Sequence, residues 1–137
     1  MVDRAAVLRL LSAAFPDLQA IYAFGSHGTK DERPNSDVDV ALLLPHRTAQ
    51  RAGNLAMGEL HRALERASNK DVDLINLRLA PTVLQHEIVN SGSVLCCADE
   101  VARQTFEMLV WSFYQKLNEE RSGVLQEGLK RGRFYDL

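Results

Sequence analysis

Two short apolar segments on either side of a polar loop constrain this chain most strongly. Residues 21–24 form a β-type run that ends directly in Gly25-Ser26, and residues 37–44 form a second run that is apolar throughout after its acidic start. The ten residues between Ser26 and Asp37 are rich in Gly, Pro, Asn and charged side chains, which is typical of a loop. A run that is apolar on both faces indicates a central strand covered by helices on at least one side.

The remaining segments predict helices and further strands around these two. Apolar spacing and helix-stop residues indicate helices over residues 3–15, 48–67 and 81–90. Residues 71–77 predict a third strand, and Val94-Leu95 a short edge strand.

One long helix is expected over about residues 99–122, and the glycines that follow weaken anything beyond it. Its core-facing stripe is predicted to be Ala102, Phe106, Leu109, Phe113 and Leu117. Trp111 and Tyr114 lie off that stripe, which indicates a second apolar surface on the same helix.

The composition describes one ordinary globular domain over residues 1–137, with 46% hydrophobic and 25% charged residues and a formal net charge of −2. Since binding to a phosphate backbone needs an excess of Lys and Arg, no direct, stable nucleic-acid binding is expected. No apolar run is long enough to span a bilayer, and the N-terminus lacks a signal-peptide pattern. The two cysteines, Cys96 and Cys97, are adjacent, so we expect a reduced, cytoplasmic protein with no membrane partner.

The acidic start of the second strand carries the first candidate site. Side chains at i and i+2 of a strand point to the same face, so Asp37 and Asp39 project side by side, with Cα atoms about 6–7 Å apart. Two such carboxylates repel each other in the absence of a cation, and hard oxygen ligands favour Mg²⁺ over zinc. Gly25-Ser26 offers a phosphate close backbone approach, exposed N–H groups and a hydroxyl. Together these segments suit chemistry on a nucleoside triphosphate.

A third acid, Asp73, lies in the next predicted strand. If this strand lies beside the Asp37 strand, three carboxylates meet at one edge, where they can hold two metal ions about 3.5–4 Å apart for in-line displacement at phosphorus. Asp71 shares the face of Asp73 and stays an alternative to it. Each motif alone has a commoner structural explanation, such as a turn or a charged strand edge, and only their order along the chain makes the combination specific.

This arrangement resembles the minimal nucleotidyltransferases, the small members of the DNA polymerase β superfamily. The family signature is Gly-Ser, ten residues and Asp-x-Asp, which stands here as residues 25–39 with the family's Arg-Pro-x-Ser at residues 33–36. Val72-Asp73-Leu74 matches the strand with the third acid, and residues 84–88 followed by Gly92 resemble a downstream phrase. The resemblance covers about residues 20–95. It departs from many relatives at His27 and Thr29, where they carry arginine.

The resemblance implies a nucleotidyltransferase fold: an α/β (α+β) domain with a small mixed β-sheet flanked by helices and a long C-terminal helix. It also implies the role of each site residue. Gly25 and Ser26, helped by Arg33 and Ser36, would bind the triphosphate. Asp37 and Asp39 would bind both metals, and Asp73 would bind the metal on the attacking side and help activate the incoming hydroxyl. Two Mg²⁺ ions would be the cofactors and ATP the substrate.

The length of the chain favours a protein as the acceptor. Polymerases need further domains to hold nucleic acid, and antibiotic-modifying relatives usually have a helical C-terminal domain around the acceptor. Stand-alone minimal nucleotidyltransferases are typically antitoxins whose partner is a HEPN-domain ribonuclease. The resemblance therefore implies an antitoxin that acts as a protein adenylyltransferase, moving AMP from ATP to a tyrosine hydroxyl of its cognate toxin and releasing pyrophosphate.

Two other functions stay open at this point. The chain could be an antitoxin that neutralises by binding alone, with the long C-terminal helix as its docking surface. It could also be a small-molecule, antibiotic-type nucleotidyltransferase that forms a homodimer to complete its acceptor pocket. The base preference, the acceptor residue, the number of AMP units and the oligomeric state do not follow from the sequence.

Overall fold

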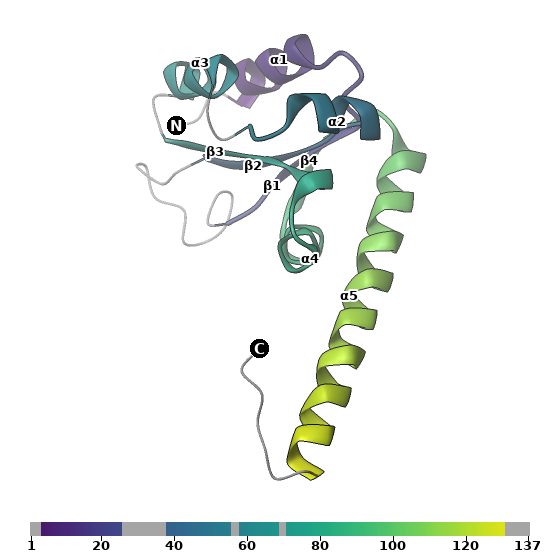
Figure 1. Cartoon of the computed structure of the whole chain (residues 1–137). Coiled ribbons are helices and arrows are strands. Elements are labelled where there is room, and N and C mark those ends of the chain that lie inside the picture. Colours follow the sequence, from purple (N-terminus) through teal and green to yellow (C-terminus); the bar gives the residue numbers. More distant parts are fainter. Residues whose placement is uncertain (1–3, 26–37, 56–57, 69–70, 131–137) are drawn as a thin grey trace.

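A four-stranded sheet lies between two layers of helices, and one long helix extends away from the domain (Figure 1). The computed structural model describes residues 4–25, 38–55, 58–68 and 71–130. In chain order the elements are α1 Arg4–Ala14, β1 Ala20–Ala23, β2 Val38–Leu43, α2 His46–Ala52, α3 Glu59–Ser68, β3 Val72–Asn76, the 3₁₀ turn η1 Leu77–Leu79, α4 Thr82–Ser91, β4 Ser93–Cys97 and α5 Glu100–Lys130.

The strand order is β3-β2-β1-β4. Strand β1 pairs antiparallel with both β2 and β4, whereas β2 and β3 pair in parallel. The predicted small mixed sheet with an edge strand around Val94-Leu95 is therefore confirmed, and the strand that carries Asp73 does lie beside the strand that carries Asp39.

Strand β2 is buried on both faces, as its continuous apolar run predicts. Residues 40–44 are at most 1% exposed. One face packs with α1 and α3 through a cluster that includes Leu11, Leu42 and Leu64. The other packs with α4 and α5 through a cluster that includes Leu43 and Phe106. Helices thus cover both sides of the sheet.

The single helix predicted over residues 48–67 is wrong, because the structure has two helices there. Helix α2 ends at Ala52, and α3 begins at Glu59. Gly53 and Gly58 have φ angles of +60° and +136°, conformations that other residues adopt only with strain and that a helix excludes. The apolar periodicity continues across this break and hides it.

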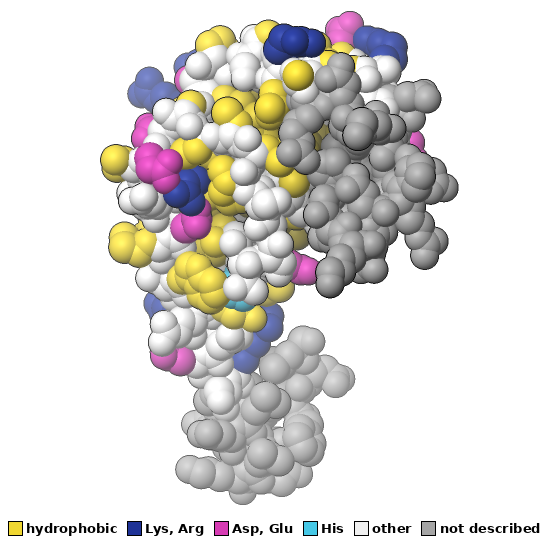
Figure 2. Space-filling model, turned by 180° about the vertical axis from the view of Figure 1, so that it is seen from behind, with side chains coloured by type: hydrophobic (Ala, Val, Ile, Leu, Met, Phe, Trp, Pro, Cys, Tyr) yellow, Lys and Arg dark blue, Asp and Glu magenta, His cyan; other side chains and the backbone are white. Residues whose placement is uncertain are grey.

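Helix α5 differs from its prediction in length and in its buried stripe. It continues eight residues past the expected end at 122, to Lys130. Phe106 is buried, but Leu109 and Phe113 are 42% and 56% exposed, and Val110 is buried instead. The reason is that the face of α5 that packs against α4 runs through Phe106, Val110 and Tyr114, so Leu109 and Phe113 lie beside that face. Figure 2 shows hydrophobic side chains at the surface near the point where this helix leaves the domain.

A polar network ties α5 to the centre of the sheet. The Tyr22 hydroxyl on β1 donates to a Glu107 carboxylate oxygen at 3.0 Å, and Arg103 forms ion pairs with both Glu107 and Glu100. Burial, and next the Glu107 contact, raise the pKa of the Tyr22 phenol well above its ordinary value. Within the described residues, no helix is both long and apolar enough to cross a membrane.

The raised pKa of Tyr22 makes a prediction about stability at alkaline pH. Because the folded state holds the phenol neutral, the free energy of unfolding should be constant through neutral pH and fall as the pH rises past about 10, the ordinary tyrosine pKa. Tyr22→Phe should cost about 1 kcal/mol at neutral pH and should show a shallower alkaline fall. Urea unfolding at about pH 8 and about pH 10.5 measures both effects. Equal pH slopes for the two proteins would contradict the assignment.

Candidate active site

Two of the three predicted carboxylates meet on adjacent strands. Asp39 of β2 lies directly opposite Asp73 of β3 in the parallel register, on strands about 4.8 Å apart. Asp39 shares its sheet face with Ala41 and Leu43, which pack towards α4 and α5, and Asp73 shares its face with Ile75 of the same cluster. Both carboxylates therefore project from the α4 side of the sheet, Asp39 half-buried and Asp73 exposed.

The register also separates the two acids of β3. Asp71 precedes the first residue of this strand, and Asp73, not Asp71, is the residue opposite Asp39. Asp71 is exposed to solvent. The geometry thus favours Asp73 as the partner of Asp39.

Gly25 touches the carboxylate of Asp39. Its φ is +71°, and a Cβ added there would lie 2.3 Å from Asp39 Oδ2. The preceding amide, Phe24 N–H, donates to the Asp39 carbonyl oxygen at 3.1 Å. The end of β1 therefore holds Asp39 through its backbone on one side and its carboxylate on the other. The sequence interpretation assigned Gly25 to phosphate binding and missed this contact, because Gly25 and Asp39 are far apart in the chain.

A second glycine lets α4 close on the end of β1. A Cβ on Gly92 would lie 2.7 Å from the Ala23 carbonyl oxygen and 2.4 Å from that of Ile88, so only a glycine fits between them.

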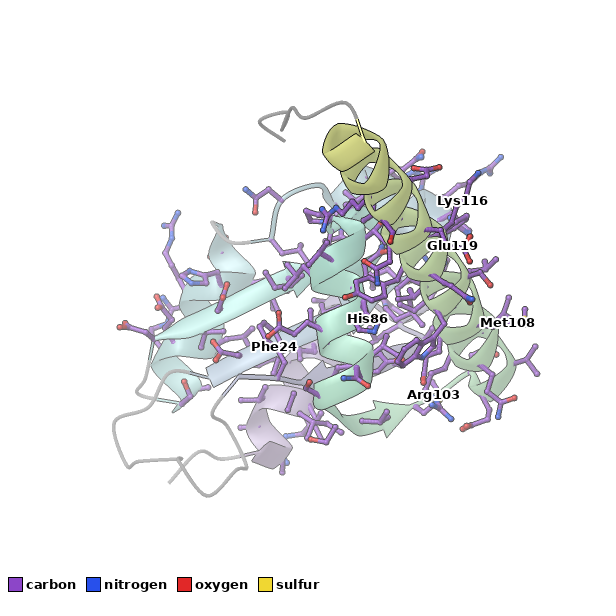
Figure 3. The ribbon with its side chains drawn as sticks, turned by 90° about the horizontal axis from the view of Figure 1, so that it is seen from below. Phe24, His86, Arg103, Met108, Lys116 and Glu119 are labelled. Atoms are coloured by element: carbon purple, nitrogen blue, oxygen red, sulfur yellow. The ribbon has the colours of Figure 1, made fainter. Side chains whose placement is uncertain are left out.

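Figure 3 shows Phe24 beside α4 on the sheet side, and His86 between α4 and α5. The His86 ring stacks on Tyr114 with centroids 3.5 Å apart and meets Trp111 edge-on. The second apolar surface predicted for the long helix thus contacts α4.

The other predicted site residues lie outside the described residues, namely Ser26, Arg33, Ser36 and Asp37. In the part of the chain that the structure describes, no group of three His, Cys, Asp or Glu side chains is placed to hold a metal ion. Asp39 and Asp73 still supply two carboxylates from adjacent strands, and Asp37 would be the third. Such an all-oxygen donor set fits Mg²⁺.

Residues 9–101 match the family profile described as "Polymerase beta, Nucleotidyltransferase". The chain belongs to this nucleotidyltransferase family. The match includes β1, β2 and β3, and therefore Gly25, Asp39 and Asp73. It confirms the fold class and the family resemblance.

Nucleotidyltransferases of known function are similar to this chain over nearly its whole length. The curated "Protein adenylyltransferase MntA" of Shewanella oneidensis is 36% identical over 121 residues, which are 88% of this chain and 84% of that protein. A chain in the "Crystal structure of the toxin-antitoxin with AMP-PNP" is 30% identical, with a TM-score of 0.72 and coverage of 93% of this chain and 99% of that one. A chain in the "tri-AMPylated Shewanella oneidensis HEPN toxin in complex with MNT antitoxin" is 29% identical, with a TM-score of 0.67 and coverage of 92% and 95%.

The contact between Gly25 and Asp39 makes a prediction for this nucleotidyltransferase. Gly25→Ala should displace the Asp39 carboxylate and lower nucleotidyl transfer about 100-fold, the typical effect of a small misplacement in a catalytic site. The measurement is pyrophosphate release, with thermal melting to show that the fold is retained.

Gly53→Ala is the matched control, because Gly53 also has a positive φ but has no atom within 4 Å of its added Cβ. It carries the same kind of backbone strain without touching the site, so transfer should stay close to that of the unaltered protein. Equal losses in the two variants would show that backbone strain alone explains the effect.

Proposed function

We propose that this chain is the antitoxin of a HEPN/MNT toxin–antitoxin pair and a protein adenylyltransferase. It transfers AMP from ATP to a tyrosine hydroxyl of its cognate HEPN-domain toxin and releases pyrophosphate. The observation that carries the proposal is the facing pair Asp39 and Asp73, with Gly25 against Asp39, in a nucleotidyltransferase similar along most of its length to a protein adenylyltransferase.

The similar complexes support the choice of partner and substrate. One contains an AMP-modified HEPN toxin with its MNT antitoxin, and another contains AMP-PNP. The excess of acidic over basic residues, with a net charge of −2, supports a protein rather than a nucleic acid as the acceptor. The whole of residues 1–137 would act as one domain, with a homodimer compatible with the same site.

The proposed site residues form two groups, one for the triphosphate and one for the metal ion. Gly25, Ser26, Arg33 and Ser36 bind the triphosphate, and Asp37, Asp39 and Asp73 would hold Mg²⁺. When bound, Mg²⁺ supplies positive charge that stabilises the transition state at phosphorus.

The tyrosine oxygen attacks the α-phosphorus of ATP and forms a new O–P bond. The bond from that phosphorus to the α,β-bridging oxygen breaks, and pyrophosphate departs with the electron pair. The carboxylate of Asp73, exposed at the start of β3, accepts the phenolic proton. Holding the two substrates in line provides most of the rate enhancement.

Intact-protein mass spectrometry of the HEPN toxin, incubated with this protein, ATP and Mg²⁺, tests the proposal. AMP-sized additions are expected with the unaltered chain. Asp39→Asn and Asp73→Asn should lower the rate of addition by at least about 100-fold, because each removes a carboxylate that would hold Mg²⁺ at the reacting phosphate. Asp71→Asn is the matched control, since Asp71 is an exposed acid outside the register with Asp39.

Each alternative function has its own signature in this experiment. If no mass is added while the toxin is still inhibited in a stable complex, the chain is a binding antitoxin and not an adenylyltransferase. Transfer to an aminoglycoside without any protein would instead indicate a small-molecule enzyme. Full activity of Asp73→Asn with loss in Asp71→Asn would exchange the roles of those two acids.

A further inference from the structure

A small pocket lies at the end of β2 opposite to the candidate active site. It is bounded by α2, the turn η1, α4 and the first half of α5, and its volume is about 140 Å³. Its polar wall consists of Arg78, His46 and Gln85, and its apolar wall includes Phe106, Leu109 and Phe113. This volume suits one protein side chain and is too small for a nucleotide, since pockets for small molecules are usually about 300 Å³ or more.

Arg78 lines this pocket and is held by two oxygen acceptors beside His46. Its Nε donates to the Leu44 carbonyl oxygen, its Nη2 to Gln19 Oε1 at 2.8 Å, and its Nη1 lies 3.3 Å from His46 Nε2. The guanidinium also lies over the Phe106 ring, 5.5 Å from its centroid. Of its five N–H groups, two have no partner among the described residues and can donate to another group.

The charge of Arg78 is partly desolvated and lacks a carboxylate partner in the described part of the chain. Burial lowers the pKa of its guanidinium. Arg103, by contrast, pairs with both Glu100 and Glu107. A desolvated guanidinium with two unused N–H groups is complementary to a carboxylate, which it can bind through both oxygens.

The apolar wall of the pocket is exposed to solvent. Leu109 and Phe113 lie one turn apart on α5 and are 42% and 56% exposed, although their spacing predicts burial. A partner segment that carries a large apolar side chain next to a carboxylate would fit here. The apolar side chain would cover Leu109 and Phe113, and the carboxylate would pair with Arg78.

We propose that the pocket between η1 and α5 is a docking site for a segment of the protein partner that presents a carboxylate beside a large apolar side chain. The partner is the HEPN-domain toxin, and in this respect the inference rests on the proposed function. Docking there would anchor the toxin at one end of β2 while its acceptor hydroxyl reaches Asp39 and Asp73 near the other.

Two opposite charges placed at Phe113 test the inference. Phe113→Glu and Phe113→Lys remove the same aromatic ring from an exposed position, so both should fold. If the occupant carries a carboxylate, the glutamate repels it and the lysine attracts it. Binding of the HEPN toxin is measured by isothermal titration calorimetry without ATP, at low and at high salt. At low salt, we expect Phe113→Glu to bind about tenfold more weakly than Phe113→Lys, and a smaller ratio at high salt.

Met108 provides the matched control. It is 62% exposed on the same helix and lies on the side turned away from α4 (Figure 3). Met108→Glu and Met108→Lys should bind the toxin with affinities within about twofold of each other, because the proposed carboxylate is not near them.

The remaining outcomes overturn the inference in distinguishable ways. Equal weakening by both Phe113 variants would mean that no acidic group docks there, and no weakening by either would mean that nothing docks there. In both cases continued AMP transfer to the toxin would leave the proposed function standing. Failure of the unaltered chain to bind the toxin would overturn the docking site and the proposed partner together.

Discussion

The parallel pairing of β2 with β3 is the constraint on which the rest of the structure depends. It sets Asp39 opposite Asp73, and a slip of one residue would turn one of them to the other face of the sheet. The slip is opposed by β3, because its buried Val72 and Leu74 alternate with the exposed Asp73, which a slip would turn towards the buried face. The alternation of β3 therefore keeps Asp73 on the same face as Asp39.

The sequence predicts those parts of the fold that depend only on residues close together in the chain. The strands carrying Asp39 and Asp73 follow from short apolar runs, and their shared face follows from the two-residue repeat. The break at Gly53 could not be predicted from periodicity, because the apolar spacing is the same on both sides of it. The exposure of Phe113 could not be predicted either, since the apolar pattern does not show which of two overlapping stripes, Leu109 with Phe113 or Val110 with Tyr114, packs against α4. The contact of Gly25 with Asp39 depends on how two separate strands pack, which no local pattern contains.

The two ends of β2 have different chemical characters. Near its start, the carboxylate of Asp39 lies against the backbone of Gly25. At its end, the carbonyl of Leu44 helps to hold a cation that lacks an acidic partner among the described residues. The central strand thus fixes the distance between an acidic site and a basic pocket. Tyr22 on the adjacent strand ties α5 to the sheet through its hydrogen bond to Glu107.

Helix α5 is about 46 Å long for its 31 residues, yet its aromatic contacts with α4 end at Tyr114. The sixteen residues from 115 to 130 continue the helix for about 24 Å beyond the last of these aromatic contacts. A tilt of about 10° at that point would move the tip by roughly 4 Å, close to the spacing of adjacent strands. The length of the helix therefore means that any small rotation at its base is amplified several-fold at Lys130.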